Sequence, residues 1–237
     1  MSKRTKSVQA ARTVREQIAR EQRRKRTLWT AIIAVAALVL AGLIGYGIYT
    51  AQKPGDYHTP EHAAANATGI ADGSGPVTVD IYLDYMCPYC KTLEQEAGAT
   101  LQKLAADKKA TVIYHPVAFL DQASTTNYST RASAASGCAA DQDKFVEFTT
   151  ELFTRQPPEG GPGLDDDALI QTAGAVGIVD PAYARCVRDG TYTSWVRHVT
   201  DAASDRGVTG TPTVFVDGQQ VAQPSAATIT AAVEAAG

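Results

Sequence analysis

Two of the four cysteines in the chain, Cys87 and Cys90, stand three positions apart in the stretch LDYMCPYCKTLEQE. At the start of a helix, this spacing brings both sulfur atoms onto one face of the first turn, within disulfide range. Such a pair can form and break a redox disulfide, supply half of a zinc site, or close a small structural loop. The surrounding residues decide among these three uses.

The residues around the pair favour redox chemistry. Cys87 directly follows a predicted strand, and Pro88 suits the first helical position because the N–H that it lacks has no partner there. Cys87 then lies near the helix N-cap, where free amides and the helix dipole stabilise a thiolate. We therefore expect Cys87 to be the exposed nucleophile and Cys90 the buried resolving thiol, with Tyr89 between them. A lowered pKa of Cys87 would make the disulfide a stronger oxidant.

Zinc and a purely structural bridge are the alternatives. A zinc site needs two more ligands, whereas Cys138 and Cys186 are isolated from the pair and from each other, with no pair of histidines nearby. A disulfide spanning two residues closes too small a loop to contribute much stability. We therefore expect neither a metal nor a cofactor at this site.

The elements predicted around the pair form a strand–helix–strand unit. Residues 77–83 (VTVDIYL) read as a buried strand, residues 91–109 carry leucine and alanine at helical spacing, and residues 111–117 (TVIYHPV) predict a second strand. A long helical region follows over about 127–204. The segment TGTPTVFVDGQQV then predicts a hairpin with an Asp-Gly turn, and a last helix ends the chain.

The N-terminal part of the chain differs in composition from the rest. Residues 1–27 hold ten basic and two acidic side chains, whereas the remainder holds twelve and 23, and the whole chain has a net charge of −3. A basic arm can indicate nucleic-acid binding. Residues 28–50, however, carry no charge, and a helix of this length spans about 33 Å, the thickness of a bilayer core. Aromatic residues stand near both ends of this run, as at membrane interfaces.

This pattern predicts a retained single-pass anchor at 28–50 rather than a nucleic-acid-binding protein. A cleaved signal peptide is the alternative, but the apolar run is long for one and no clear cleavage site follows it. The basic arm at 1–27 then stays in the cytoplasm as a topology signal. Residues 51–65 read as a tether, with a short strand near 67–70, and residues 66–237 lie outside the cell membrane, where disulfides persist.

A strand followed by DYMCPYC and a helix, and later by GTPTVFVDG, resembles the DsbA-type thiol oxidoreductases of the thioredoxin superfamily. More narrowly, it resembles their membrane-anchored actinobacterial members. The likeness covers about residues 66–237. It implies an α/β protein with a thioredoxin fold and an inserted all-helical subdomain, preceded by a single transmembrane helix.

The resemblance also implies a substrate-binding site around the pair. It places a cis proline at Pro212, preceded by Gly210 and Thr211, opposite the dithiol and its Pro88 and Tyr89. A proline there removes a backbone N–H beside the sulfurs, and the neighbouring backbone can pair with an extended substrate chain.

The chain departs from the family at a buried acidic residue that often acts as a proton relay. Ile81 occupies that position here, and strand alternation puts Asp80 on the opposite face. Asp84 is the nearest substitute, although a turn-capping role for it is equally open.

The other two cysteines leave three connectivities open from sequence alone. Cys138 and Cys186 have matching positions in the family, and the resemblance implies a structural disulfide between them. A second redox pair is the functional alternative.

The resemblance implies an extracytoplasmic thiol:disulfide oxidoreductase that introduces disulfides into reduced exported proteins through Cys87 and Cys90. Its implied partner is a membrane oxidase of the vitamin K epoxide reductase type. The Pro-Tyr dipeptide does not fix the redox potential, which varies by more than 100 mV in this superfamily. A disulfide isomerase or reductase on the same fold therefore remains an alternative. So does a non-catalytic, membrane-tethered binding module with structural disulfides.

Overall fold

The computed structural model describes residue 29, residues 37–43 and residues 57–237. The predicted arm at 1–27, most of the predicted anchor at 28–50 and the first part of the predicted tether lie outside the described residues. Residues 37–43 are helical, and their large apolar side chains are exposed. Within the described ranges, no helix is both long and apolar enough to cross a membrane.

Within residues 57–237, a mixed sheet of five strands has the order β1-β3-β2-β4-β5. Strands β2 and β3 are parallel, and every other neighbouring pair is antiparallel. The strands are β1 (Ile70–Asp72), β2 (Val77–Leu83), β3 (Ala110–Pro116), β4 (Thr213–Val216) and β5 (Gln219–Gln220). The strand that precedes the cysteine pair is therefore central, with a partner on each side.

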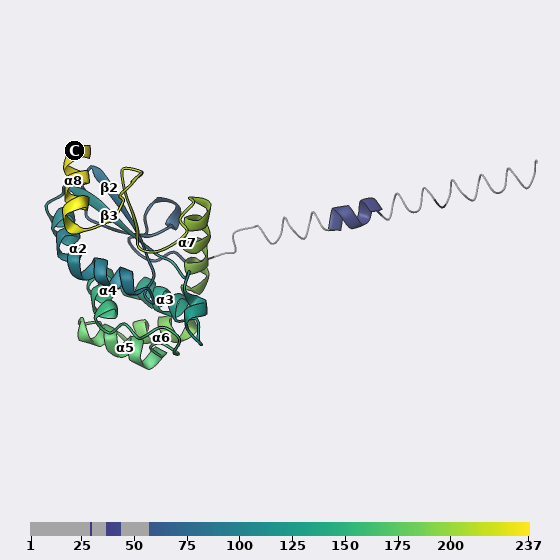
Figure 1. The fold of residues 1–237 in the computed structure, drawn as a ribbon. Helices are drawn as coiled ribbons and strands as arrows, with labels where there is room; N and C mark the ends of the chain where they lie inside the picture. Colours follow the sequence, from purple (N-terminus) through teal and green to yellow (C-terminus); the bar gives the residue numbers. More distant parts are fainter. Residues whose placement is uncertain (1–28, 30–36, 44–56) are drawn as a thin grey trace, which may run out of the picture. The chain divides into compact units, whose positions relative to one another are not determined.

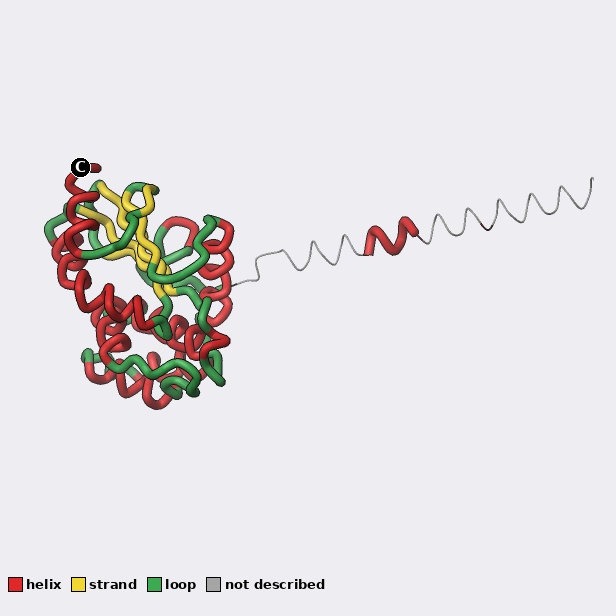
Figure 2. The backbone as a smooth tube through the Cα atoms, in the orientation of Figure 1, coloured by secondary structure: helices red, strands yellow, loops and turns green. Residues whose placement is uncertain are grey.

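Helices cover both faces of this sheet, and a helical part adjoins it (Figures 1 and 2). Helices α2 and α8 lie on one side and α7 on the other, while α3 to α6 gather beyond one end of the sheet. The helices are α2 (Pro88–Ala106), α3 (Tyr128–Ala140), α4 (Phe145–Thr154), α5 (Asp166–Ala175), α6 (Pro181–Asp189), α7 (Thr193–Asp205) and α8 (Ala226–Ala236). The predicted helical region at 127–204 thus consists of α3 to α7.

The core forms where β2 meets α2. Alternate residues of β2, including Ile81 and Leu83, face the apolar side of α2, where Leu93 and Leu101 are buried. Burying one leucine contributes roughly 1.5–3 kcal/mol, so this face fixes the helix firmly on the sheet. The start of α2 is thereby held at the carboxyl end of β2.

Local sequence signals define most element ends. The Asp-Gly turn between β4 and β5 has positive φ at both residues, 43° at Asp217 and 79° at Gly218, as a tight hairpin requires. The Asp165 side chain accepts a hydrogen bond from the Ala168 amide (2.8 Å) and caps α5. Pro181 stands in the first turn of α6, and Ser225 forms a capping box with Thr228 at α8.

The short strand predicted near 67–70 is wrong in its position. Residues Ala65–Ala67 form a 3-10 turn, and the strand begins at Ile70. Asn66 and Ala67 have φ values of 68° and 54°, which an extended strand does not allow. Their carbonyls accept hydrogen bonds from His198 (2.9 Å) and Trp195 (2.7 Å) of α7 instead of from a neighbouring strand.

Candidate active site

Cys87 is the N-cap residue of α2, with extended backbone angles (φ −73°, ψ 118°) and Pro88 in the first turn. Its carbonyl accepts hydrogen bonds from the amides of Cys90 (3.1 Å) and Lys91 (3.3 Å), which close that turn. Both Cys87 and Cys90 are free thiols in this structure. The local sequence therefore places the pair as expected, at the positive end of a 19-residue helix.

The expectation that Cys87 is exposed is wrong, because its residue is only 4% exposed. The reason is a contact from far along the chain. The Thr211 carbonyl oxygen lies 3.2 Å from Cys87 Sγ and accepts a hydrogen bond from it when the thiol is protonated. Tyr89, by contrast, is 75% exposed beside the pair.

The two thiols differ strongly in acidity. The pKa of Cys87 falls to about 6, chiefly because the Cys90 thiol donates a hydrogen bond to it; the Thr211 side chain and the amides of Cys90 and Tyr89 add to this, against burial. Burial, together with the hydrogen bond and charge of Cys87, raises the pKa of Cys90 well above its ordinary value. Near neutral pH, Cys87 is thus mostly a thiolate and Cys90 a thiol.

The Thr211–Pro212 peptide bond is cis, at the position expected from the sequence. Pro212 borders a small cavity of about 10 Å³ together with Cys90, whereas Gly210 is exposed. The structure thus brings Pro88, Tyr89, Thr211 and Pro212 together with the two cysteines.

Asp84 lies directly beside the pair, and its side chain is fully buried. Its carboxylate accepts hydrogen bonds from the amides of Met86 (2.9 Å) and Leu120 (2.9 Å) and from the Ser129 hydroxyl (2.6 Å). The backbone amide of Asp84 also contacts Cys90 Sγ at 3.5 Å. Burial raises the pKa of Asp84 to about 6, against these hydrogen bonds. Asp84 therefore holds the turn and also titrates close to the thiols.

Neither Ile81 nor Asp80 of β2 can take the place of Asp84 as a proton-carrying group beside Cys90. Ile81 faces the cavity behind Cys90, with no group that can carry a proton. Asp80 points to the opposite face, as predicted, and its carboxylate binds His115 (3.0 Å) and Arg206 (3.0 Å) there.

Sequence reasoning missed Glu94, which lines the same cavity as Cys90. The Glu94 carboxylate accepts a hydrogen bond from the Thr150 hydroxyl (2.7 Å), and burial raises its pKa. The signal was its spacing, because a residue four positions after Cys90 lies on the same face of α2. A cavity of this size holds at most one water molecule.

Sequence reasoning also missed Gln156, which lies in the segment RQPPEGGPG after α4. Its Nε2 donates hydrogen bonds to the carbonyls of Tyr85 and Cys87, both at 2.9 Å. No pattern in the sequence marks it, since the contact joins residues about 70 positions apart.

The remaining two cysteines form a disulfide away from this pair. Cys138 of α3 is bonded to Cys186 of α6, with their Cα atoms 6.0 Å apart. Across the described part of the chain, no group of three His, Cys, Asp or Glu residues has the arrangement of a metal site. Among the four cysteines, Cys87 and Cys90 therefore have only each other as disulfide partners.

Residues 66–235 match the protein family described as Thioredoxin. The chain belongs to the thioredoxin family. DsbA from Mycobacterium tuberculosis in its reduced form is 30% identical, with a TM-score of 0.63 over 71% of this chain and 91% of that one. Reduced DsbG from the same species is 32% identical, with a TM-score of 0.61 over 69% of this chain and 82% of that one.

A curated relative, the serine/threonine-protein kinase PknE of Mycobacterium tuberculosis, is 33% identical over 169 residues. The match covers 65% of this chain but only 29% of PknE. The chain thus spans less than a third of that relative. MdbA from Actinomyces oris, at 22% identity and a TM-score of 0.63 over 77% of this chain and 94% of that one, shares the fold.

These likenesses confirm the α/β thioredoxin-like fold with a helical insertion. Together with the dithiol, the likeness to DsbA and DsbG supports a thiol–disulfide oxidoreductase.

Proposed function

We propose that this protein is an extracytoplasmic thiol:disulfide oxidase that transfers the Cys87–Cys90 disulfide to reduced exported proteins. The observation that carries the proposal is the position of Cys87 at the N-cap of α2, with Cys90 in the first turn; there the pKa of Cys87 falls to about 6. A stable thiolate is a good leaving group and stabilises the dithiol product. Both effects drive transfer of the disulfide toward the substrate.

The reaction balances as two thiol–disulfide exchanges. A substrate thiolate attacks Cys87 Sγ, forms a mixed disulfide and releases Cys90 as a thiolate, which takes up a proton because its pKa is high. A second substrate thiolate then attacks the substrate sulfur of the mixed disulfide and releases the Cys87 thiolate. The substrate loses two electrons and the pair gains them.

Asp84 is the residue that we propose for the proton transfer to Cys90. The pKa of its carboxyl, about 6, lets it exchange protons near neutral pH. The backbone N–H of Asp84 contacts Cys90 Sγ, which places the residue beside that sulfur. The exposed Tyr89 and the loop of Gly210, Thr211 and Pro212 would hold the substrate, which can add as an extended strand.

Our proposal for the location rests on the sequence before the folded unit. The uncharged run at 28–50 behind a basic arm supports a membrane anchor with a cytoplasmic N-terminus. The Cys138–Cys186 disulfide suits an oxidising compartment outside the membrane. A membrane oxidase of the vitamin K epoxide reductase type would then reoxidise the pair.

The redox potential of the pair tests the oxidase proposal. Purified protein is equilibrated in glutathione buffers of graded ratio, and the thiols are trapped and counted by mass spectrometry, with Cys87→Ser as the control. We expect a potential clearly above about −270 mV but below about −120 mV, because the strongest oxidants of this kind have a thiol more acidic than Cys87; we also expect oxidation of reduced, denatured ribonuclease. A potential near −270 mV without ribonuclease oxidation would contradict the proposal.

A disulfide isomerase on the same fold is the second candidate, because the Cys87 thiolate of the reduced pair could itself attack a substrate disulfide. Ribonuclease with scrambled disulfides separates the two. An isomerase restores its activity with the pair reduced, whereas an oxidase acts on reduced ribonuclease with the pair oxidised.

A further inference from the structure

Side chains of the helical insertion form hydrogen bonds with the turn that carries Cys87. Three side chains of the insertion reach residues 84–87. Ser129 of α3 donates to the Asp84 carboxylate (2.6 Å), and Thr149 of α4 shares a hydrogen bond with the Tyr85 hydroxyl (2.8 Å). Gln156 contacts the backbone itself, through the carbonyls of Tyr85 and Cys87.

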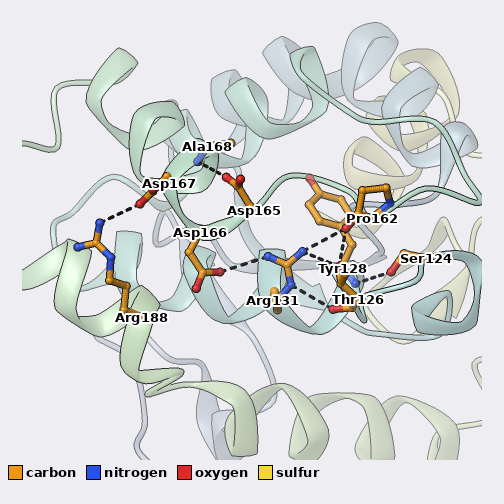
Figure 3. Close-up of polar contacts among 10 residues, drawn as sticks. All are labelled: Ser124, Thr126, Tyr128, Arg131, Pro162, Asp165, Asp166, Asp167, Ala168 and Arg188. Carbon is orange, nitrogen blue, oxygen red and sulfur yellow. Dashed lines mark hydrogen bonds and ion pairs between the residues drawn. The ribbon is translucent and has the colours of Figure 1, made fainter.

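The segment that carries Gln156 is itself anchored at its far end (Figure 3). Arg131 of α3 donates to the carbonyls of Thr126 (3.1 Å) and Pro162 (3.2 Å) and to the carboxylate of Asp166 (3.2 Å). Backbone hydrogen bonds from Thr125 to Gly161 and from Gly160 to Ala123 add to this. Gln156 is therefore presented by a loop with both ends fixed.

The two carbonyls that Gln156 binds lie in the turn that leads into α2. Cys87 is the N-cap of α2, and its carbonyl also accepts the first amides of the helix. A side-chain amide has two N–H donors, and both are used on carbonyls that flank the turn. The Gln156 amide thus ties down both sides of the residue that bears the reactive sulfur.

We propose that Gln156 is a positioning residue, whose side-chain amide fixes the backbone of Tyr85 and Cys87 and so sets the reactivity of the Cys87 sulfur. The acceptors of its Nε2 are the backbone carbonyls of Tyr85 and Cys87 and not the sulfur itself. The inference rests on the proposed function, because it concerns the same redox pair. Through Gln156, the helical insertion tunes the pair that the thioredoxin core carries.

The test compares Gln156→Ala with the wild type and with Gln95→Ala, a change at an exposed glutamine of α2. Losing these hydrogen bonds frees the turn, so the thiolate is less well stabilised. We expect the equilibrium with glutathione to shift about tenfold toward the disulfide, or about 30 mV more reducing. The thiolate pKa of Cys87, followed by absorbance at 240 nm, should rise, whereas Gln95→Ala should change neither value.

The variant Gln156→Glu gives a pH signature that a merely structural role lacks. While it is protonated, the new carboxyl can donate one hydrogen bond to a carbonyl. Once it is ionised, it has no hydrogen to donate and can only accept hydrogen bonds. Its potential should therefore approach that of the wild type at low pH and depart from it as pH rises, beyond the ordinary pH dependence of the wild type.

The outcomes separate this inference from the function itself. Lower thermal stability of Gln156→Ala with an unchanged potential and an unchanged thiolate pKa would overturn the positioning role and leave the oxidase intact. A wild-type protein without a measurable Cys87–Cys90 couple would instead reject the proposed function.

Discussion

Asp84 links the stability of the fold to pH through a single buried carboxyl. Its folded pKa of about 6 exceeds the unfolded value of about 3.9. Between these values the native state binds more protons than the unfolded chain, so the free energy of unfolding falls as pH rises from 4 to 6. The loss from this one group is on the order of 3 kcal/mol.

The variant Asp84→Asn should lack this contribution, because an amide does not titrate. Urea unfolding of the oxidised protein at pH 4 and pH 7 measures it, since no free thiol then ionises. We expect the difference between the two pH values to change by on the order of 3 kcal/mol relative to the wild type. Asp201→Asn, an exposed residue of α7, is the control. The same pH dependence in all three proteins would show that the Asp84 pKa is not raised.

The sequence reveals individual residues where a local pattern defines them. Cys87, Cys90 and Pro88 form such a pattern, because N-cap position, proline and spacing are adjacent in the chain. Exposure is different: Cys87 is buried by Thr211, which no local pattern connects to it. Gln156 is likewise defined only by two carbonyls that folding brings to it.

At the scale of elements, burial and capping signals predicted most of the chain. Strand β2 and the start of α2 lie where the apolar run and Pro88 place them. The strand near 67–70 failed because side chains of α7 bind carbonyls of the 3-10 turn there. Sequence periodicity does not register such a tertiary contact, which changes the local backbone.

The loop after α4 depends on a glycine that packs against an aromatic ring. Gly163 has φ +71°, and a Cβ there would lie 2.4 Å from Cγ of the buried Tyr128 ring. Gly177 has a similar φ of +87° but no atom within 4 Å of its Cβ position. The two positions therefore separate the backbone effect from the steric one.

We expect Gly177→Ala to lower the free energy of unfolding by about 1–2 kcal/mol, the effect of a left-handed alanine. Gly163→Ala should lower it by at least about 3 kcal/mol, because the Tyr128 ring must also move. Denaturant unfolding of both variants measures the difference. Equal losses would mean that the ring yields freely and that Gly163 is needed only for its φ.

At the scale of the whole molecule, a small sheet carries the sulfur chemistry and a helical insertion braces it. The family resemblance implied this division, but not how the two parts communicate. The contacts from Ser129, Thr149 and Gln156 to residues 84–87 supply that link. The stability of the entire folded unit should therefore respond to the redox state of the pair.

We expect the reduced protein to gain stability over the oxidised protein as pH rises. Cys87 has a folded pKa of about 6, below the unfolded value of about 8.5, and it titrates only when reduced. Its contribution is fully present above pH 8.5 and is lost as pH falls through 6. The stability of the reduced form relative to the oxidised form should therefore increase by on the order of 3 kcal/mol between pH 5 and pH 8.5.

Denaturant unfolding of both redox forms at these two pH values measures that gap. The Cys87–Cys90 disulfide closes too small a loop to offset the effect by restricting the unfolded chain. In Cys87→Ser, which leaves Cys138 and Cys186 bonded, reductant that spares the structural disulfide should change stability little at either pH. A gap in the wild type that stays constant from pH 5 to 8.5 would mean that folding does not stabilise the Cys87 thiolate, and the driving force proposed for disulfide donation would be absent.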